Sequence, residues 1–321
     1  MGDRLMEGFR LLRAGRRRRS MPHPHSEAGS MTLIYRDFDQ AGLDAAYNNR
    51  NAVPDFQAAY VDRWAATSAT VRTRVPCRLD IAYGPSPRQR LDVFTPAGSS
   101  PPGGRPALLY IHGGYWQSNH KDSYSFPAPV VTGTGALYIA ATYDLCPDVT
   151  MTVLLEQVRQ AVGWLHLHAR DIGLDPARLV VAGHSAGGHI AASLAHTDWA
   201  ARGLPAGALA GALPLSGLYD LEPIRLNYLN AACRMDVAEA AALSPIRHIR
   251  PGAPPTVLVV GGAELPELVR QTRDYGAALA QAGVPPRAVV ESPGDNHFSV
   301  VDVLFDPAGP LWSHLKGLLG A

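Results

Sequence analysis

The sequence has few of the features that would commit a protein to a special environment. Its three cysteines, Cys77, Cys146 and Cys233, are odd in number and widely spaced, so they suggest neither a disulfide framework nor a pair of metal ligands. The formal net charge of +1 gives no bias toward nucleic acid or acidic partners. No hydrophobic run is long enough to cross a membrane. These absences favour a globular protein in a reducing, cytoplasmic setting.

The sequence also lacks the usual signs of a metal or cofactor site. It has no glycine-rich phosphate loop, and no histidine, cysteine and carboxylate ligands stand at metal-binding spacing. His166 and His168 are two residues apart on an expected helix, so they face different sides and cannot bind one metal ion together. We therefore expect no metal and no cofactor.

Residues 1–30 differ in kind from the rest of the chain. A basic run at residues 16–19 is followed by a segment that contains His23 and His25, with no apolar stretch long enough for a secretory signal. A membrane-binding or nucleic-acid-binding arm is one interpretation. We favour a disordered tail or an over-extended gene start, with Met21 or Met31 as the true beginning.

From about residue 39, strand-like and helix-like patterns alternate. Residues 39–63 have a helical pattern, residues 77–83 and 90–95 alternate as two antiparallel strands, and residues 152–170 have the apolar spacing of a helix. Buried strands are expected at 107–112, 135–143, 178–183, 208–215, 254–262 and 286–291. This alternation predicts an α/β fold, a mostly parallel central sheet flanked by helices, in a single domain over residues 31–321.

The most informative motif is Gly183-His184-Ser185-Ala186-Gly187, which stands between an apolar strand and a helix-like stretch. A serine hydroxyl can attack a carbonyl only if it is held clear of the backbone, and a sharp strand-to-helix turn does this at the cost of strain. Flanking glycines avoid crowding in that turn, and the following helix directs its unpaired amides at the reaction site. The motif predicts Ser185 as a nucleophile.

A second motif, His-Gly-Gly-Tyr-Trp from His112, ends another apolar run about 70 residues before the serine. Attack on a carbonyl places negative charge on its oxygen, and each backbone amide preorganised to bind that oxygen contributes roughly 2.7–4 kcal/mol. We expect the amides of Gly113, Gly114 and Ala186 to form this oxyanion hole. Taken alone, the motif is equally consistent with a tight turn after a strand.

An acid and a histidine follow the serine in the order expected for a catalytic triad on such a sheet. Glu264 stands just past the strand at 254–262, and His297 lies in the loop after the strand at 286–291. The histidine would take the serine proton and return it to the leaving group, because imidazole exchanges a proton near neutral pH. Glu264 would hold the imidazole of His297 in the required tautomer.

Three other acids compete for the same role. Asp295 is too close in sequence to His297 to reach the far imidazole nitrogen easily, and is expected to cap its own loop. Glu267 falls in the first turn of the next helix, where an acid suits the helix dipole. Asp220 follows a different strand, one step too early. Glu264 is therefore the preferred acid.

Candidate substrate-binding residues come from two places. Tyr115 and Trp116, beside the expected oxyanion hole, would narrow the acyl side of a pocket and leave room for an aromatic leaving group. A long insertion at residues 216–251 can cap such a pocket, and its Tyr219 is a candidate for lining an aryl-sized cavity. Simple packing of the insertion onto the sheet is equally consistent with its mixed composition.

Together these motifs resemble those of the serine-dependent kynurenine formamidase (arylformamidase) family within the α/β-hydrolases. The resemblance also rests on the motifs that begin at Ser216, Gly262 and Asp295, and it covers most of the chain from about Tyr35. It implies an α/β-hydrolase fold and N-formyl-kynurenine as substrate. Esterases of the hormone-sensitive-lipase kind share the first two motifs, usually with a third glycine where Tyr115 stands.

Carried over by position, the family's triad falls on Ser185, Glu264 and His297. The family's acid is commonly aspartate, so the glutamate at 264 departs from its pattern. Three functions follow in order of preference: a serine hydrolase that cleaves the formyl amide of an aryl amine through an acyl-enzyme, a short-chain carboxylesterase of broad specificity, and a non-catalytic binding module. The expected partner is a small-molecule substrate, and a homodimer is compatible with the sequence.

Overall fold

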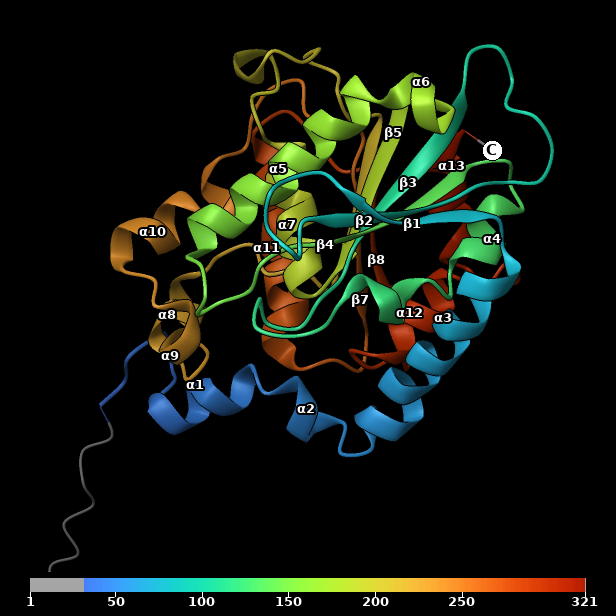
Figure 1. Cartoon of the computed structure of the whole chain (residues 1–321). Helices are drawn as coiled ribbons and strands as arrows, with labels where there is room; N and C mark the ends of the chain where they lie inside the picture. Colours follow the sequence, from blue (N-terminus) through green and yellow to red (C-terminus); the bar gives the residue numbers. More distant parts are fainter. Residues whose placement is uncertain (1–31, 321) are drawn as a thin grey trace, which may run out of the picture. The chain divides into compact units, whose positions relative to one another are not determined.

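One mixed sheet of eight strands forms the centre of the protein (Figure 1). Its strands are β1 Cys77–Ala82, β2 Arg90–Phe94, β3 Arg105–Ile111, β4 Leu137–Thr142, β5 Leu174–His184, β6 Gly211–Leu215, β7 Val257–Gly261 and β8 Ala288–Ser292. They lie in the order β1-β2-β4-β3-β5-β6-β7-β8. The six strands from β4 to β8 in this order run parallel, and the antiparallel β1–β2 hairpin joins their edge through β4. The predicted α/β fold with a mostly parallel sheet is confirmed.

The computed structural model describes residues 32–320, and residues from Leu33 onward belong to one compact unit. The expectations for the tail at residues 1–30 lie outside the described residues. Among residues 32–320, no helix is long and apolar enough to cross a membrane.

Helices cover both faces of the sheet. The helices are α1 Gln40–Ala46, α2 Asn49–Ala52, α3 Asp62–Arg74, α4 Ala128–Thr132, α5 Met151–Leu167, α6 Ala169–Ile172, α7 Ala186–Ala195, α8 Glu222–Leu226, α9 Asn230–Cys233, α10 Val237–Ala242, α11 Pro266–Gln281, α12 Ser299–Leu304 and α13 Trp312–Leu319. Helices α5, α7 and α11 pack on one face, whereas α3, α4, α12 and α13 pack on the other (Figure 1).

Successive residues of the central strands enter opposite cores. Leu179 and Val181 of β5 pack with the α5 and α7 side, whereas Val180 and Ala182 pack with the α13 side. This alternation follows from the pleat of a strand, whose neighbouring side chains point to opposite faces. Both faces are buried, which is why the parallel strands appear in the sequence as continuous apolar runs.

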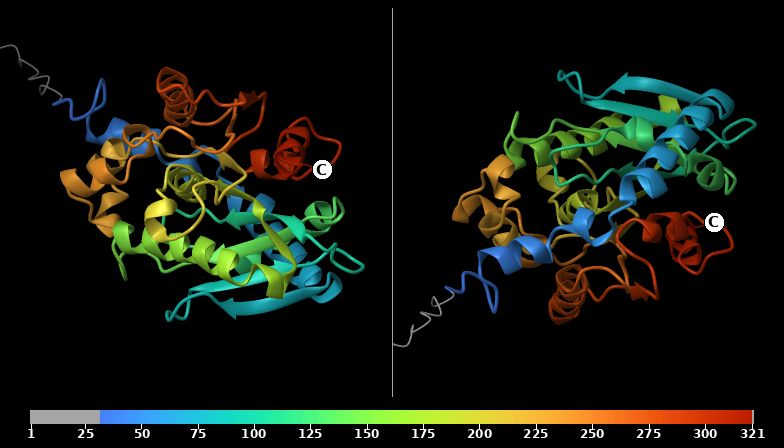
Figure 2. Two further views of the ribbon diagram at one scale, coloured as in Figure 1. Left: turned by 90° about the horizontal axis from the view of Figure 1, so that it is seen from above. Right: turned by 90° about the horizontal axis from the view of Figure 1, so that it is seen from below.

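The segment before the sheet differs from the single helix expected at residues 39–63. It forms α1, α2, a π-helical turn at Gln57–Val61 and then α3, which continues to Arg74. The side chain of Asn48 caps α2 by accepting a hydrogen bond from the Asn51 amide, and Pro54 lacks the N–H that a continuous helix would need. Figure 2 (right) shows the segment crossing the molecule from α1 to α3.

Candidate active site

Ser185 stands in the sharp turn between β5 and α7. Its backbone has φ 58°, a conformation that non-glycine residues rarely adopt, and its amide donates to the Leu215 carbonyl at 2.8 Å. A β-carbon at Gly183 would lie 2.2 Å from the Gly187 carbonyl oxygen, and one at Gly187 would lie 2.1 Å from the Ile111 oxygen. The turn therefore needs both glycines, as the sequence predicted.

His297 and Glu264 meet beside this turn. The imidazole Nδ1 lies 2.6 Å from Glu264 Oε2, and both side chains are buried. The other carboxylate oxygen, Oε1, accepts a hydrogen bond from Ser216 Oγ at 2.5 Å and another from the Gly261 amide at 2.7 Å. The carboxylate is thus fixed on both oxygens, and it holds the imidazole by Nδ1 so that Nε2 is left for other chemistry.

Two of the three competing acids are engaged elsewhere. Asp295 accepts hydrogen bonds from the hydroxyls of Ser292 and Ser299 in its own loop, at 2.5 and 2.8 Å. Glu267 forms a bidentate pair with Arg270 in the first turn of α11, at 2.7 Å for both bonds. Burial acts to raise the pKa of Glu267, but the guanidinium brings it below its ordinary value. These positions agree with the roles expected from the sequence.

His184, the second residue of the serine motif, was not among the predicted site residues. Its Nε2 lies 2.7 Å from the carbonyl oxygen of His297, and the centroids of the two rings are 4.6 Å apart. Burial lowers the pKa of His184 well below its ordinary value, so the neutral ring donates its Nε2–H to that carbonyl. His184 therefore fixes the backbone that carries His297. The sequence feature that could have pointed to His184 is its position directly before Ser185.

The glycine loop after β3 lies against the serine turn. A β-carbon at Gly113 would be 3.1 Å from Ser185 Cβ, and Gly114 has φ 117°. Within residues 32–320, the amides of Gly113 and Gly114 donate to no protein acceptor. Ala186 is the first residue of α7, where helix amides have no partner within the helix. The three predicted oxyanion donors are therefore gathered around the serine.

A cavity of about 70 Å³ contains the serine hydroxyl and the imidazole. Ser185, His184, His297 and Gly114 form part of its wall. The rest is largely aromatic, and comprises Phe56, Trp64, Tyr115, Tyr124 and Phe298 with Asn49, Arg50, Gln57, Val61 and Asn119. Much of this wall belongs to residues 49–64, which the sequence had not marked as part of the site. Stacking of Phe56 on Phe298, with ring centroids 4.9 Å apart, joins that segment to the His297 loop.

Two of the three predicted substrate-binding residues were wrong. Tyr115 lines the cavity, but Trp116 is completely buried and its Nε1 donates to His189 Nδ1 at 3.2 Å. Tyr219 is also completely buried, stacked on Tyr275 with ring centroids 4.2 Å apart. Both rings pack in the hydrophobic core and do not line the cavity.

Of the two interpretations of the insertion, a cap over the pocket and simple packing onto the sheet, neither is decided by the lining of the cavity. The insertion at residues 216–251, which includes α8, α9 and α10, supplies no residue to the cavity at Ser185. Its Tyr228 and Leu229 line a neighbouring hollow of about 380 Å³, which shares Arg50, Gly114 and Tyr115 with the cavity. Residues 49–64 cover the serine.

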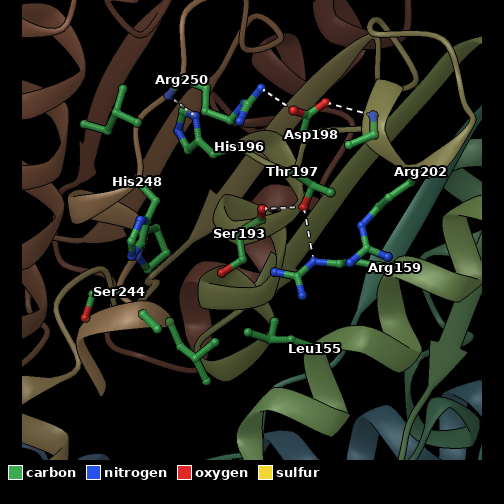
Figure 3. A pocket seen from close by; sticks show the side chains of 15 residues that line it. Leu155, Arg159, Ser193, His196, Thr197, Asp198, Arg202, Ser244, His248 and Arg250 are labelled. Carbon is green, nitrogen blue, oxygen red and sulfur yellow. Dashed lines mark hydrogen bonds and ion pairs between the residues drawn. The ribbon is translucent and has the colours of Figure 1, made fainter. Parts of the chain in front are cut away.

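A larger hollow, of about 800 Å³, lies at the far end of α7 and does not contain the serine (Figure 3). Its arginines have carboxylate partners, since Arg202 pairs with Glu156 at 2.6 Å and Arg250 pairs with Asp198 at 2.7 Å. Burial lowers the pKa of His196 to about 4, so that imidazole stays neutral at pH 7. This hollow holds no counterpart of the serine, histidine and acid arrangement.

Among residues 32–320, no three His, Cys, Asp or Glu side chains lie close enough together to hold a metal ion. His166 Nε2 contacts the Ala208 carbonyl at 2.9 Å, whereas His168 Nδ1 contacts the Trp164 carbonyl at 3.0 Å. The two histidines thus have separate structural partners, as their spacing predicted.

Residues 108–300 match a family model described as alpha/beta hydrolase fold. The sheet order, the strand-turn-helix at Ser185 and the glycine loop after β3 are the features that such a fold requires. Fold and site therefore define an α/β-hydrolase, an enzyme of the hydrolase class.

Individual relatives narrow this class. Kynurenine formamidase from Danio rerio is 31% identical over 280 residues, which cover 85% of this chain and 92% of that protein. A crystal structure from Silicibacter sp. TM1040, provisionally described as a thioesterase, is 30% identical, with a TM-score of 0.73 over 87% of this chain and 99% of the other. Esterase LipQ of Mycobacterium tuberculosis is 28% identical over 68% of this chain and 56% of that protein. The chain belongs to the kynurenine formamidase family of α/β-hydrolases.

Proposed function

We propose that the protein is a serine hydrolase that cleaves the formyl amide of an aryl amine, such as N-formyl-kynurenine. The observation that carries this proposal is the cavity at Ser185, which is only about 70 Å³ in volume and has a largely aromatic wall. With an aryl leaving group against the aromatic side chains, so small a cavity leaves little room for an acyl group larger than formyl. The similarity to kynurenine formamidase supports the same substrate class.

The reaction begins with attack of Ser185 Oγ on the formyl carbon. His297 takes the serine proton through Nε2, while Glu264 keeps the Nδ1 proton in place and stabilises the imidazolium. The carbonyl oxygen becomes an oxyanion, and the amides of Gly113, Gly114 and Ala186 stabilise its charge. These assignments rest on the contact between His297 and Glu264, on the place of Ser185 and His297 in one cavity, and on the unpaired amides of the glycine loop.

The tetrahedral intermediate then collapses. The C–N bond breaks, His297 gives its proton to the departing nitrogen, and the aryl amine leaves a formyl ester on Ser185. Water next adds to that ester, with His297 as base. The ester bond breaks, the serine recovers its proton, and formate is released.

A carboxylesterase is the second candidate, because the same groups would hydrolyse an ester and the chain is similar to an esterase. The hollow of about 380 Å³ beside the cavity would give longer groups room. A non-catalytic binding module is less well supported, because His297 contacts Glu264 and lines the same cavity as Ser185, so candidates for all three triad roles are present. The cytoplasmic location and the homodimer stay predictions.

The size of the acyl site can be measured with amides that share one leaving group. We expect kcat/KM to fall from formanilide to acetanilide to butyranilide, because each methylene that does not fit costs about 1–3 kcal/mol, or roughly 10- to 200-fold. The rates at which hydroxide alone hydrolyses the three amides measure their intrinsic reactivities. Each kcat/KM should be divided by the hydroxide rate of the same amide. A kcat/KM for butyranilide equal to that for formanilide after this correction would contradict the formyl-sized site.

A further inference from the structure

Helix α2 is attached to the glycine loop of the active site. The amide of Asn49 donates to the Tyr115 hydroxyl at 3.0 Å, and that hydroxyl donates to the Tyr47 carbonyl at 2.9 Å. Tyr115 itself lines the Ser185 cavity. The first residues of α2 are thereby held at the edge of the cavity, where they can contact a bound substrate.

Arg50 is the one permanently charged side chain in the wall of the Ser185 cavity, and also in the wall of the adjoining hollow. Its guanidinium lies 5.6 Å from the centroid of the Tyr115 ring and 5.9 Å from that of Phe56, and its Nη2 donates to Ser118 Oγ at 3.3 Å. These contacts hold the cation in place without neutralising it.

No aspartate or glutamate within residues 32–320 forms an ion pair with Arg50. This distinguishes it from the arginines around the large hollow, where Arg202 is paired with Glu156. Arg250 is paired there with Asp198, as Figure 3 shows. A guanidinium offers a planar fork of N–H donors that matches a carboxylate. The charge at the edge of the active site is therefore available to an anion.

Asn49 gives an independent sign that a ligand completes this wall. Its side chain is 3% exposed and lines the cavity, yet Oδ1 has no hydrogen-bond partner among the described residues. Buried polar atoms are usually paired, because an unpaired one loses its hydration without compensation. An N–H group of a bound substrate would satisfy Oδ1.

We propose that Arg50 binds a carboxylate on the leaving group of the substrate and so determines a preference for aryl formamides whose side chain carries a carboxylate. The inference rests on the proposed function and specifies its substrate class. The aryl ring lies in the aromatic cavity, its N–H faces Asn49, and the side chain extends into the hollow that Arg50 shares with the cavity. The amino-acid side chain of N-formyl-kynurenine has this form.

The test compares a formamide that carries a carboxylate with an uncharged one that does not. The purified enzyme and its Arg50→Gln variant are assayed with N-formyl-kynurenine and with ortho-formamidoacetophenone, which has the same formamide and ring ketone but no carboxylate. Arg50→Gln should lower kcat/KM for N-formyl-kynurenine about tenfold to hundredfold, mainly through KM, because a hydrogen bond between charged groups is lost. Its kcat/KM for the uncharged formamide should change less than about twofold.

Two variants serve as controls. Arg50→Lys keeps the charge and should retain part of the preference for the substrate that carries the carboxylate. Arg273→Gln removes an exposed arginine of α11, paired with Glu291, and should leave both substrates unaffected. It controls for the change in net charge.

An equal loss on both substrates would show that Arg50 acts only by supporting Tyr115, and would overturn the inference. Unchanged kinetics with N-formyl-kynurenine would overturn it as well. In both cases, hydrolysis of ortho-formamidoacetophenone by the unmodified enzyme would leave the proposed function standing. Failure to hydrolyse either formamide, with p-nitrophenyl acetate still cleaved, would refute both proposals.

Discussion

Replacing Ser185 with alanine should lower kcat for N-formyl-kynurenine by about a million-fold, the loss typical of removing a triad serine. The remaining rate would come from the oxyanion hole and from substrate binding. The fold should persist, because within residues 32–320 the Ser185 hydroxyl makes no hydrogen bond to another protein group. Steady-state kinetics should be measured with a melting curve of each protein.

Ser193→Ala is the matched control, since Ser193 lies on the same helix and lines only the large hollow. It should retain turnover. A fluorophosphonate should label Ser185 alone, as read by peptide mass spectrometry, and should label the Ser193→Ala variant equally well. Normal activity in Ser185→Ala, or labelling at another residue, would remove the basis for the proposed triad.

Glu264→Gln should have the second-largest effect, a fall in kcat of about ten-thousand-fold. The imidazolium that forms during attack would lose its counter-charge, and the amide could hold the imidazole in the wrong tautomer. Glu264→Asp keeps the charge but shortens the side chain by one methylene. Its kcat should lie between that of Glu264→Gln and that of the unmodified enzyme. The kcat of all variants should be compared at one pH with saturating substrate.

Asp295→Asn is the control for this experiment, because Asp295 bonds to two serines of its own loop and not to the imidazole. Its kcat should fall by less than about tenfold, since only a loop contact is weakened. If Asp295→Asn were the more damaging change, the acid role would pass to Asp295.

The part of the site that the sequence predicted best is local. Gly183, Ser185 and Gly187 lie within five consecutive positions, and steric crowding within that turn requires the two glycines. The order of Ser185, Glu264 and His297 along the chain could also be read, because each follows the end of a strand that can be seen as an apolar run. Parallel strands place their carboxyl ends at one edge of the sheet.

The contacts that the sequence did not reveal join residues far apart in the chain. Ser216 supports Glu264 from 48 positions away, and the Asn49 amide meets Tyr115 across 66 positions. No periodicity encodes such pairs. The pattern of residues 49–64 indicated only a polar-faced helix. Their position over the serine became visible only in the structure.

The errors at Trp116 and Tyr219 come from side-chain direction. Tyr115 and Trp116 both have positive φ, at 54° and 60°, so this turn follows neither strand nor helix geometry. The side chains of neighbouring residues in this turn can therefore point into different parts of the protein, and of the two only Tyr115 lines the cavity. For Tyr219, the aromatic partner is Tyr275 on α11, and no pattern in the sequence identifies that pair.

Substrate kinetics distinguish a formamidase from an esterase. The kcat/KM for N-formyl-kynurenine should be compared with the values for p-nitrophenyl acetate, butyrate and octanoate under the same conditions. An amide is intrinsically less reactive than an activated aryl ester. We predict that the formamide is nevertheless cleaved at least as efficiently as the acetate, and that efficiency falls with acyl length, because the cavity at Ser185 is small. Preference for the butyrate or octanoate with no cleavage of the formamide would contradict this account and identify the protein as an esterase.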